Sequence, residues 1–144
     1  MRRNYYLLGI SLVALALIAG FGMATKKPEI RIKAALDQTV YRKNTPIGVA
    51  VLIYTTKDTQ IEFSSAKLYD LILEKDGKTI WQLSDMKMYA QSLMKRDFKA
   101  GEPQIYSTVI DASQIKLEPG HYLLKPVFCG NPAITGQPVG LDIQ

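Results

Sequence analysis

Apolar and polar residues alternate through most of the chain, and this pattern predicts β-strands rather than helices. In residues 30–34, two isoleucines and an alanine alternate with Arg31 and Lys33, which is typical of a strand with one buried face. Residues 47–54, with the sequence IGVAVLIY, are almost continuously apolar. That favours a strand that is covered on both faces or lies at the centre of a sheet. After Ala24, no stretch sustains a helical period.

Short strands separated by turn signals continue to the C-terminus. Further strands are predicted at residues 61–63, in a hairpin at residues 69–83, at residues 104–113 and 121–128, and, with a weaker signal, at residues 135–144. Seven or eight short strands of this kind predict an all-β fold, an antiparallel β-sandwich.

The hairpin at residues 69–83 can form in two registers. A two-residue Asp-Gly turn would pair Leu73 with Ile80. A three-residue loop with Gly77 in the left-handed conformation would pair Leu71 with Trp81. We favour the second register, because one buried face strongly selects how strands pair. It collects the bulky apolar side chains on one face: Tyr69, Leu71, Leu73, Trp81 and Leu83.

The strand at residues 121–128 contains a proline on its apolar face. Pro126 has no N–H to donate to a neighbouring strand, so it marks an edge position, a β-bulge or the end of the strand. A Pro-Gly turn precedes Tyr122, an arrangement similar to the tyrosine corner of Greek-key sandwiches. We expect the Tyr122 hydroxyl to bond a main-chain atom between Ser113 and Leu117, because a buried phenol needs a partner.

The N-terminus departs from this pattern. Residues 5–24 are twenty residues without a charge, long enough to cross a bilayer as a helix. Arg2 and Arg3 precede them, which predicts a cytoplasmic N-terminus and an exported remainder. The segment is either retained as a membrane anchor or cleaved as a signal peptide, since small residues follow its apolar run. Its arginine pair is also a weak match to a twin-arginine signal. Because no Cys follows the apolar run, a lipid anchor is not indicated.

These features divide the chain into a signal peptide or anchor helix at residues 1–24 and one domain at residues 25–144. The chain has 144 residues, 47% of them hydrophobic and 22% charged, which suits one globular core. The single Cys excludes an internal disulfide. The formal charge of +5 is spread in single residues and short pairs, so no nucleic-acid surface is indicated. We expect a membrane-anchored extracytoplasmic or secreted protein.

The chemistry expected of an enzyme is sparse in the sequence. The single His, His121, and the single Cys, Cys129, mark the two ends of one strand, and an extended strand of that length separates them by roughly 26 Å. A Cys–His dyad and a tetrahedral zinc site are therefore not expected. A hydrolase using His121 in a triad stays possible, but no nucleophile elbow supports it. No phosphate-binding loop is present, and the acids lie on separate elements. The sequence predicts no catalytic residue, metal, cofactor or small-molecule substrate.

The order and spacing of several motifs resemble the intracellular proteinase inhibitor family known as BsuPI. The resemblance covers roughly residues 30–128. It includes an aromatic-Asp pair, a Gly-Lys hairpin, a Trp-bearing strand, a Ser-Asp turn and a closing Pro-Gly-x-Tyr strand. The residues that carry it are Tyr69-Asp70, Gly77-Lys78, Trp81, Ser84-Asp85, Lys87, Tyr89, Gln91, Gly101-Glu102, Pro119-Gly120 and Tyr122.

This resemblance implies an immunoglobulin-like β-sandwich and inhibition of a serine protease. Within such a fold we expect Trp81 in the core, and residues 84–91 as the crossover from one sheet to the other. Met86, Met88 and Tyr89 are expected to pack and anchor this crossover rather than to contact a partner.

Two functions follow from the sequence. The first is a non-enzymatic, envelope-located binding domain that inhibits a protease through loops or an edge strand. The alternative is an accessory or structural subunit of a membrane assembly, tethered through residues 5–24. The sequence identifies no protein-binding residue, because the resemblance carries no reactive-site motif.

Overall fold

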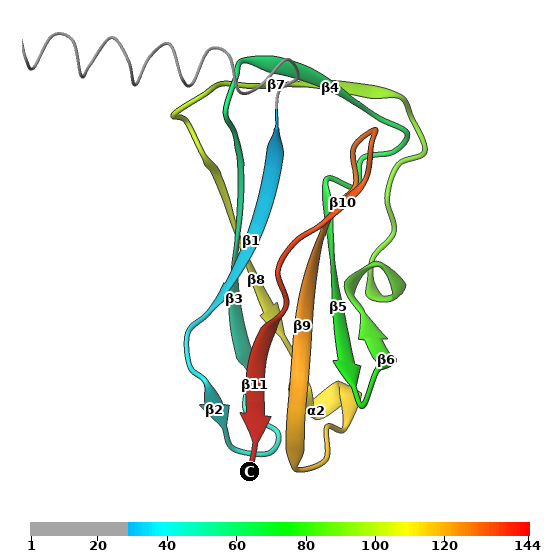
Figure 1. The fold of residues 1–144 in the computed structure, drawn as a ribbon. Coiled ribbons are helices and arrows are strands. Elements are labelled where there is room, and N and C mark those ends of the chain that lie inside the picture. Colours follow the sequence, from blue (N-terminus) through cyan, green and yellow to red (C-terminus); the bar gives the residue numbers. More distant parts are fainter. Residues whose placement is uncertain (1–28) are drawn as a thin grey trace, which may run out of the picture.

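The computed structural model describes residues 29–144, which form a β-sandwich (Figure 1). The N-terminal apolar helix expected from the sequence lies outside this range. Within residues 29–144, no helix is long and apolar enough to cross a membrane. The elements are β1 (Ile30–Leu36), β2 (Val40–Tyr41), β3 (Ile47–Thr55), β4 (Thr59–Phe63), β5 (Tyr69–Lys75), β6 (Lys78–Gln82), the 3-10 helix η1 (Leu83–Met86), β7 (Met94–Phe98), β8 (Gln104–Ile110), α2 (Ala112–Ile115), β9 (Gly120–Phe128), β10 (Ile134–Thr135) and β11 (Val139–Ile143).

The strands form two main sheets and one small pair. One sheet has the order β1-β3-β8, and the other has the order β2-β11-β9-β5-β6, with β10 also paired to β9. The two-stranded sheet β4-β7 crosses one end of the molecule (Figure 1). All pairs are antiparallel except β2 with β11, which is parallel. The purely antiparallel sandwich predicted from the sequence is therefore corrected at this one short pair.

Eleven strands are present in residues 29–144, against the seven or eight predicted. The three that the sequence pattern did not reveal are β2, β7 and β10. Strands β2 and β10 have two residues each, too few to show a period. Strand β7 has three charged residues and buries only Phe98 fully, so it lacks an apolar face.

The core lies between the two main sheets and is built from their facing side chains. Strand β3 is central in its sheet, as expected, and its odd-numbered residues are buried. Its even-numbered residues are only half-buried, so the prediction that both faces are covered is wrong for the outer face. At the end crossed by β4 and β7, the rings of Phe63, Phe98 and Phe128 pack with centroids 5.4–6.4 Å apart. This aromatic cluster closes the core at that end.

The β5–β6 hairpin has the predicted buried face but a different register. Leu71 and Leu73 are fully buried, and Trp81 packs half-buried against the same core. The turn is the two-residue type, pairing Lys75 with Lys78, and a bulge then places Leu73 opposite Trp81. Neither predicted register is correct beyond the bulge, because the bulge inserts one residue, Ile80, into β6.

Pro126 lies inside the central strand β9 rather than at an edge. Its carbonyl accepts a hydrogen bond from the Gly136 amide at 2.8 Å, on the side where β10 has ended and β11 has not yet begun. In antiparallel strands the N and C=O of one residue face the same neighbour. The missing N–H of Pro126 therefore faces this gap between two strands, where no ladder bond is required.

The predicted tyrosine corner is present, with a partner one residue beyond the expected segment. Tyr122 is buried, and its hydroxyl donates a hydrogen bond to the main-chain carbonyl of Glu118. The bond ties the turn between α2 and β9 to the core. The expected partner lay between Ser113 and Leu117, and the difference arises because α2 occupies part of that segment.

Removing this hydroxyl tests the corner. Tyr122→Phe keeps the ring in the core but leaves the Glu118 carbonyl without this donor, so we expect a loss of about 1–2 kcal/mol in the free energy of unfolding. Denaturant titration measures it. A midpoint equal to that of the wild type would show that the bond contributes nothing to stability.

Candidate protein-binding surface

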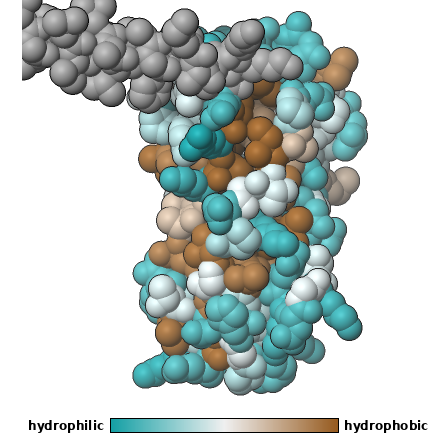
Figure 2. Space-filling model, viewed as in Figure 1, coloured by the Kyte–Doolittle hydropathy of each residue, from teal (hydrophilic) through white to brown (hydrophobic). Residues whose placement is uncertain are grey.

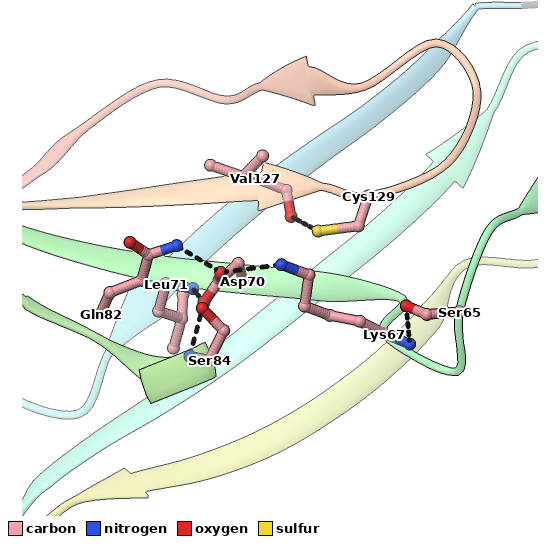
Figure 3. A network of polar contacts seen from close by, with 8 residues as sticks. All are labelled: Ser65, Lys67, Asp70, Leu71, Gln82, Ser84, Val127 and Cys129. Atoms are coloured by element: carbon pink, nitrogen blue, oxygen red, sulfur yellow. Dashed lines mark hydrogen bonds and ion pairs between the residues drawn. The ribbon is translucent and has the colours of Figure 1, made fainter. Parts of the chain in front are cut away.

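A buried carboxylate organises the side of the molecule on which the β5–β6 hairpin ends (Figure 3). Asp70 is 2% exposed and lies on the β5 face opposite the core leucines. One carboxylate oxygen accepts the main-chain amides of Leu71 at 2.9 Å and Ser84 at 3.0 Å. The other carboxylate oxygen accepts hydrogen bonds from Gln82 Nε2 at 2.7 Å and from Lys67 Nζ at 3.4 Å. Asp70 therefore connects β5, the end of β6 and the first residues of η1.

The hydrogen bonds keep this buried carboxylate charged. Burial alone raises the pKa of Asp70, but the bonds from Gln82, Ser84 and Leu71 outweigh burial and hold the pKa below its ordinary value. Lys67 supplies the matching positive charge and is itself mostly shielded from solvent. We conclude that Asp70 is a structural anion that fixes where η1 begins.

An exposed segment without regular structure follows η1. We call residues 87–93 the Met88 segment. It starts at Lys87 with extended backbone angles, φ −133° and ψ 147°, and it belongs to no helix or strand. The Met88 side chain is 101% exposed. In Figure 1 the chain between η1 and β7 runs along the outside of the sandwich.

The two residues that follow Met88 attach the Met88 segment to the rest of the domain. The first of them, Tyr89, is half-buried. Burial, followed by the charge of Asp70, raises the pKa of Tyr89. One residue further, the carbonyl of Ala90 accepts the amide of Ala66 at 2.9 Å. The segment is thus both exposed and tethered.

The sequence-based expectation for this region is correct in part. Tyr89 does act as an anchor, but Met86 and Met88 are 58% and 101% exposed and do not pack. The segment leads to β7 in the small sheet rather than directly to the opposite main sheet. The signal that could have identified it is the absence of any apolar period between the hairpin and β7.

A second exposed feature is the free edge of β8. Asp37 N donates to Gly48 O at 3.1 Å, so the even-numbered residues of β3 bond β1, and its odd-numbered residues bond β8. By this alternation, Ile105, Ser107 and Val109 of β8 direct their backbone groups outward. The side chains of Ile105 and Val109 are 67% and 68% exposed. An extended peptide could pair with this edge.

A small cavity lies between the edges of the two main sheets. Its volume is 260 Å³, and it is lined by Trp81, Leu83, Met86, Lys87, Val109, Ile110, Asp111, Gln114 and Ile115. Small-molecule pockets have volumes of about 300–1,000 Å³, so this cavity is below their usual size. On the face that Figure 2 shows, hydrophobic residues appear in separate areas divided by polar ones. The Met88 segment and the β8 edge carry the most exposed large hydrophobic side chains of the described residues, which makes them the candidates for contact with a protein.

The two residues considered for catalysis are far apart in the fold. His121 lies at the start of β9 and Cys129 follows its last residue. His121 Nδ1 is 2.7 Å from an exposed Asp142 carboxylate oxygen, and both side chains are more than half exposed. Burial raises the pKa of the Cys129 thiol, which makes it a poor nucleophile. The opposing charge of Lys67 is a smaller effect, and the charge of Asp70 adds a still smaller rise.

Substituting the buried carboxylate tests its role. Asp70→Asn removes the charge and sets an amide against donors of Gln82 and Lys67, so we expect a loss of about 2–4 kcal/mol in unfolding free energy at neutral pH. Because the folded pKa lies below the ordinary value of 3.8, this contribution is present above pH 3.8 and is lost as the pH falls through the folded pKa. The difference from wild type should therefore shrink in acid. Asp85→Asn, at an exposed aspartate of η1, is the control and should change stability by less than about 0.5 kcal/mol. Equal losses in the two variants would contradict the assignment.

Solved structures with similar folds differ greatly in sequence. The sporulation control protein Spo0M from Bacillus subtilis matches with a TM-score of 0.53 and 11% identity, over 80% of this chain and 49% of that chain. A mutant β-glucosidase from Listeria innocua in complex with laminaribiose matches with a TM-score of 0.50 and 13% identity, over 86% of this chain and 17% of that chain. The chain thus spans about half of the first protein and a small part of the second. Likeness at this identity shows the fold alone.

No curated protein sequence matches the chain significantly. The sequence profile of a family described as "Intracellular proteinase inhibitor" (BsuPI) matches residues 34–133. That description contradicts the expected membrane-anchored extracytoplasmic or secreted location, and the expectation is corrected accordingly. Families of this kind act by binding proteases rather than by catalysis. Because the match covers most of the 144 residues, the chain belongs to the intracellular proteinase inhibitor family.

Proposed function

We propose that this chain inhibits a serine protease by placing an exposed part of an immunoglobulin-like sandwich in the protease's substrate cleft. The family match over residues 34–133 is the observation that carries the proposal. The structure supplies two surfaces suited to it, the Met88 segment and the β8 edge. The alternative of a membrane-tethered subunit depended on residues 5–24, which lie outside the described residues.

A rigid scaffold is what an inhibitor of this type requires. Proteases bind their substrates as extended chains, and a flexible segment loses conformational freedom when it binds. A segment that is already extended and tethered loses less, so it binds more tightly for the same contacts. Packed sheets, the aromatic cluster of Phe63, Phe98 and Phe128, and the Asp70 network give this domain the necessary rigidity.

The experiment is a titration of the full-length chain against a subtilisin-like serine protease and a small peptide substrate. We expect hydrolysis to slow with increasing chain concentration and to stay slow, with an inhibition constant at or below micromolar. The heat-unfolded chain is the control, because it competes as an ordinary substrate and its effect fades as it is digested. No slowing at micromolar folded chain, across serine proteases of different primary specificity, would reject inhibition.

A further inference from the structure

We propose that the Met88 segment is the reactive segment of the inhibitor, and that Met88 enters the primary specificity pocket of the protease. This inference rests on the proposed inhibitory function. It commits to a partner of defined chemistry, a serine protease with an apolar primary pocket.

Exposure distinguishes Met88 from the other apolar side chains. Among the described residues with exposed large hydrophobic side chains, Met88 is 101% exposed, Leu93 84% and Val109 68%. A side chain that stands fully in solvent gains the most when a pocket covers it. The methionine side chain is also unbranched and flexible, so it can adapt its conformation to a deep, narrow pocket.

The backbone of the segment suits a substrate cleft. A protease binds an extended chain by pairing with its main-chain groups, so those groups must be free of a neighbouring strand. Lys87 has extended angles, and no residue from 87 to 93 belongs to a strand. The Ala66–Ala90 bond is the backbone–backbone contact that ties the segment to the rest of the described chain.

Tethers lie on both sides of Met88. On the N-terminal side, the amide of Ser84 is bound to Asp70 at the start of η1. On the C-terminal side, Tyr89 is half-buried, and the Ala90 carbonyl accepts a hydrogen bond from the Ala66 amide. When the protease serine attacks the Met88 carbonyl, the Met88–Tyr89 peptide bond breaks, an acyl-enzyme forms on Met88, and the amine released on Tyr89 stays in place before water can hydrolyse the acyl-enzyme. The tethered amine can then rejoin the acyl-enzyme, which slows turnover and favours inhibition over digestion.

The β8 edge is the weaker candidate for the cleft. Strand β8 is paired with β3 along its whole length, and the second sheet packs against the inner face of both. A cleft that accepts one extended chain would have to admit this layered edge. Ile105 and Val109 also project from the face of the sheet rather than from its edge. The Met88 segment meets neither obstacle.

The test compares matched charge substitutions in the full-length chain. Met88→Glu places a charge in the apolar pocket and should raise the inhibition constant on the order of 100-fold. Met88→Leu keeps an apolar side chain and should stay within about tenfold. Ile105→Glu is the control at an exposed β8 residue and should change the constant by less than about threefold. Because Met88 and Ile105 are exposed, thermal unfolding midpoints should match the wild type in all three variants.

The outcomes separate this inference from the proposed function. If the wild-type chain inhibits no serine protease, the proposed function fails. If the wild type inhibits and Met88→Glu leaves the inhibition constant unchanged, the reactive segment is wrong while inhibition stands. If Ile105→Glu raises the inhibition constant and Met88→Glu does not, the protease contacts the β8 edge instead of the Met88 segment. A slow cleavage product that ends at Met88, identified by mass, would support the assignment.

Discussion

The buried carboxylate of Asp70 is the interaction on which the candidate surface depends. A buried anion is costly unless its oxygens are fully bonded, and here four donors bond them. Those donors come from the loop before β5, from β5 itself, from β6 and from η1. Fixing one group therefore fixes the direction in which the chain leaves the hairpin. The aromatic-Asp pair at Tyr69 and Asp70 is thus a structural motif, whereas Met88 is the exposed residue that it helps to position.

The shape of the Met88 segment follows from the topology. Strand β6 ends partway along β5, with Gln82 opposite Ile72, and β7 pairs with β4 in the small sheet that crosses one end of the molecule (Figure 1). The seven residues between η1 and β7 run along the outside of the sandwich (Figure 1), and they belong to no strand. Tyr89 and Ala90 attach it partway, leaving Met88 in solvent. An exposed and tethered segment is the consequence of connecting the hairpin to the small sheet by a link outside the sandwich.

Much of the sandwich could be predicted from residue alternation, because buried faces impose a period on the sequence. Leu71 and Leu73 were placed correctly on the core face for this reason. The hairpin register was missed because a bulge at Ile80 depends on packing that no local pattern records. Asp70 alternates with these leucines and lies on the outer face, but its burial there depends on donors from Lys67 and Gln82 that only the folded chain brings together.

The candidate site was harder to predict than the fold. The apolar character of Met86 and Met88 favoured packing, but an irregular segment has no period from which to infer which side chains face the core. The pairing of β7 with β4 decides the path of the segment, and the charged residues of β7 conceal that strand in the sequence. The tyrosine corner was easier, because a turn before an inward tyrosine is a local signal.

Amide hydrogen exchange of the full-length chain, with and without a catalytically inactive serine protease, tests most directly whether the Asp70-anchored segment contacts the enzyme. The account predicts slower exchange in residues 87–93 on binding, with exchange across β8 unchanged. Protection of residues 104–110, with none in residues 87–93, would contradict it.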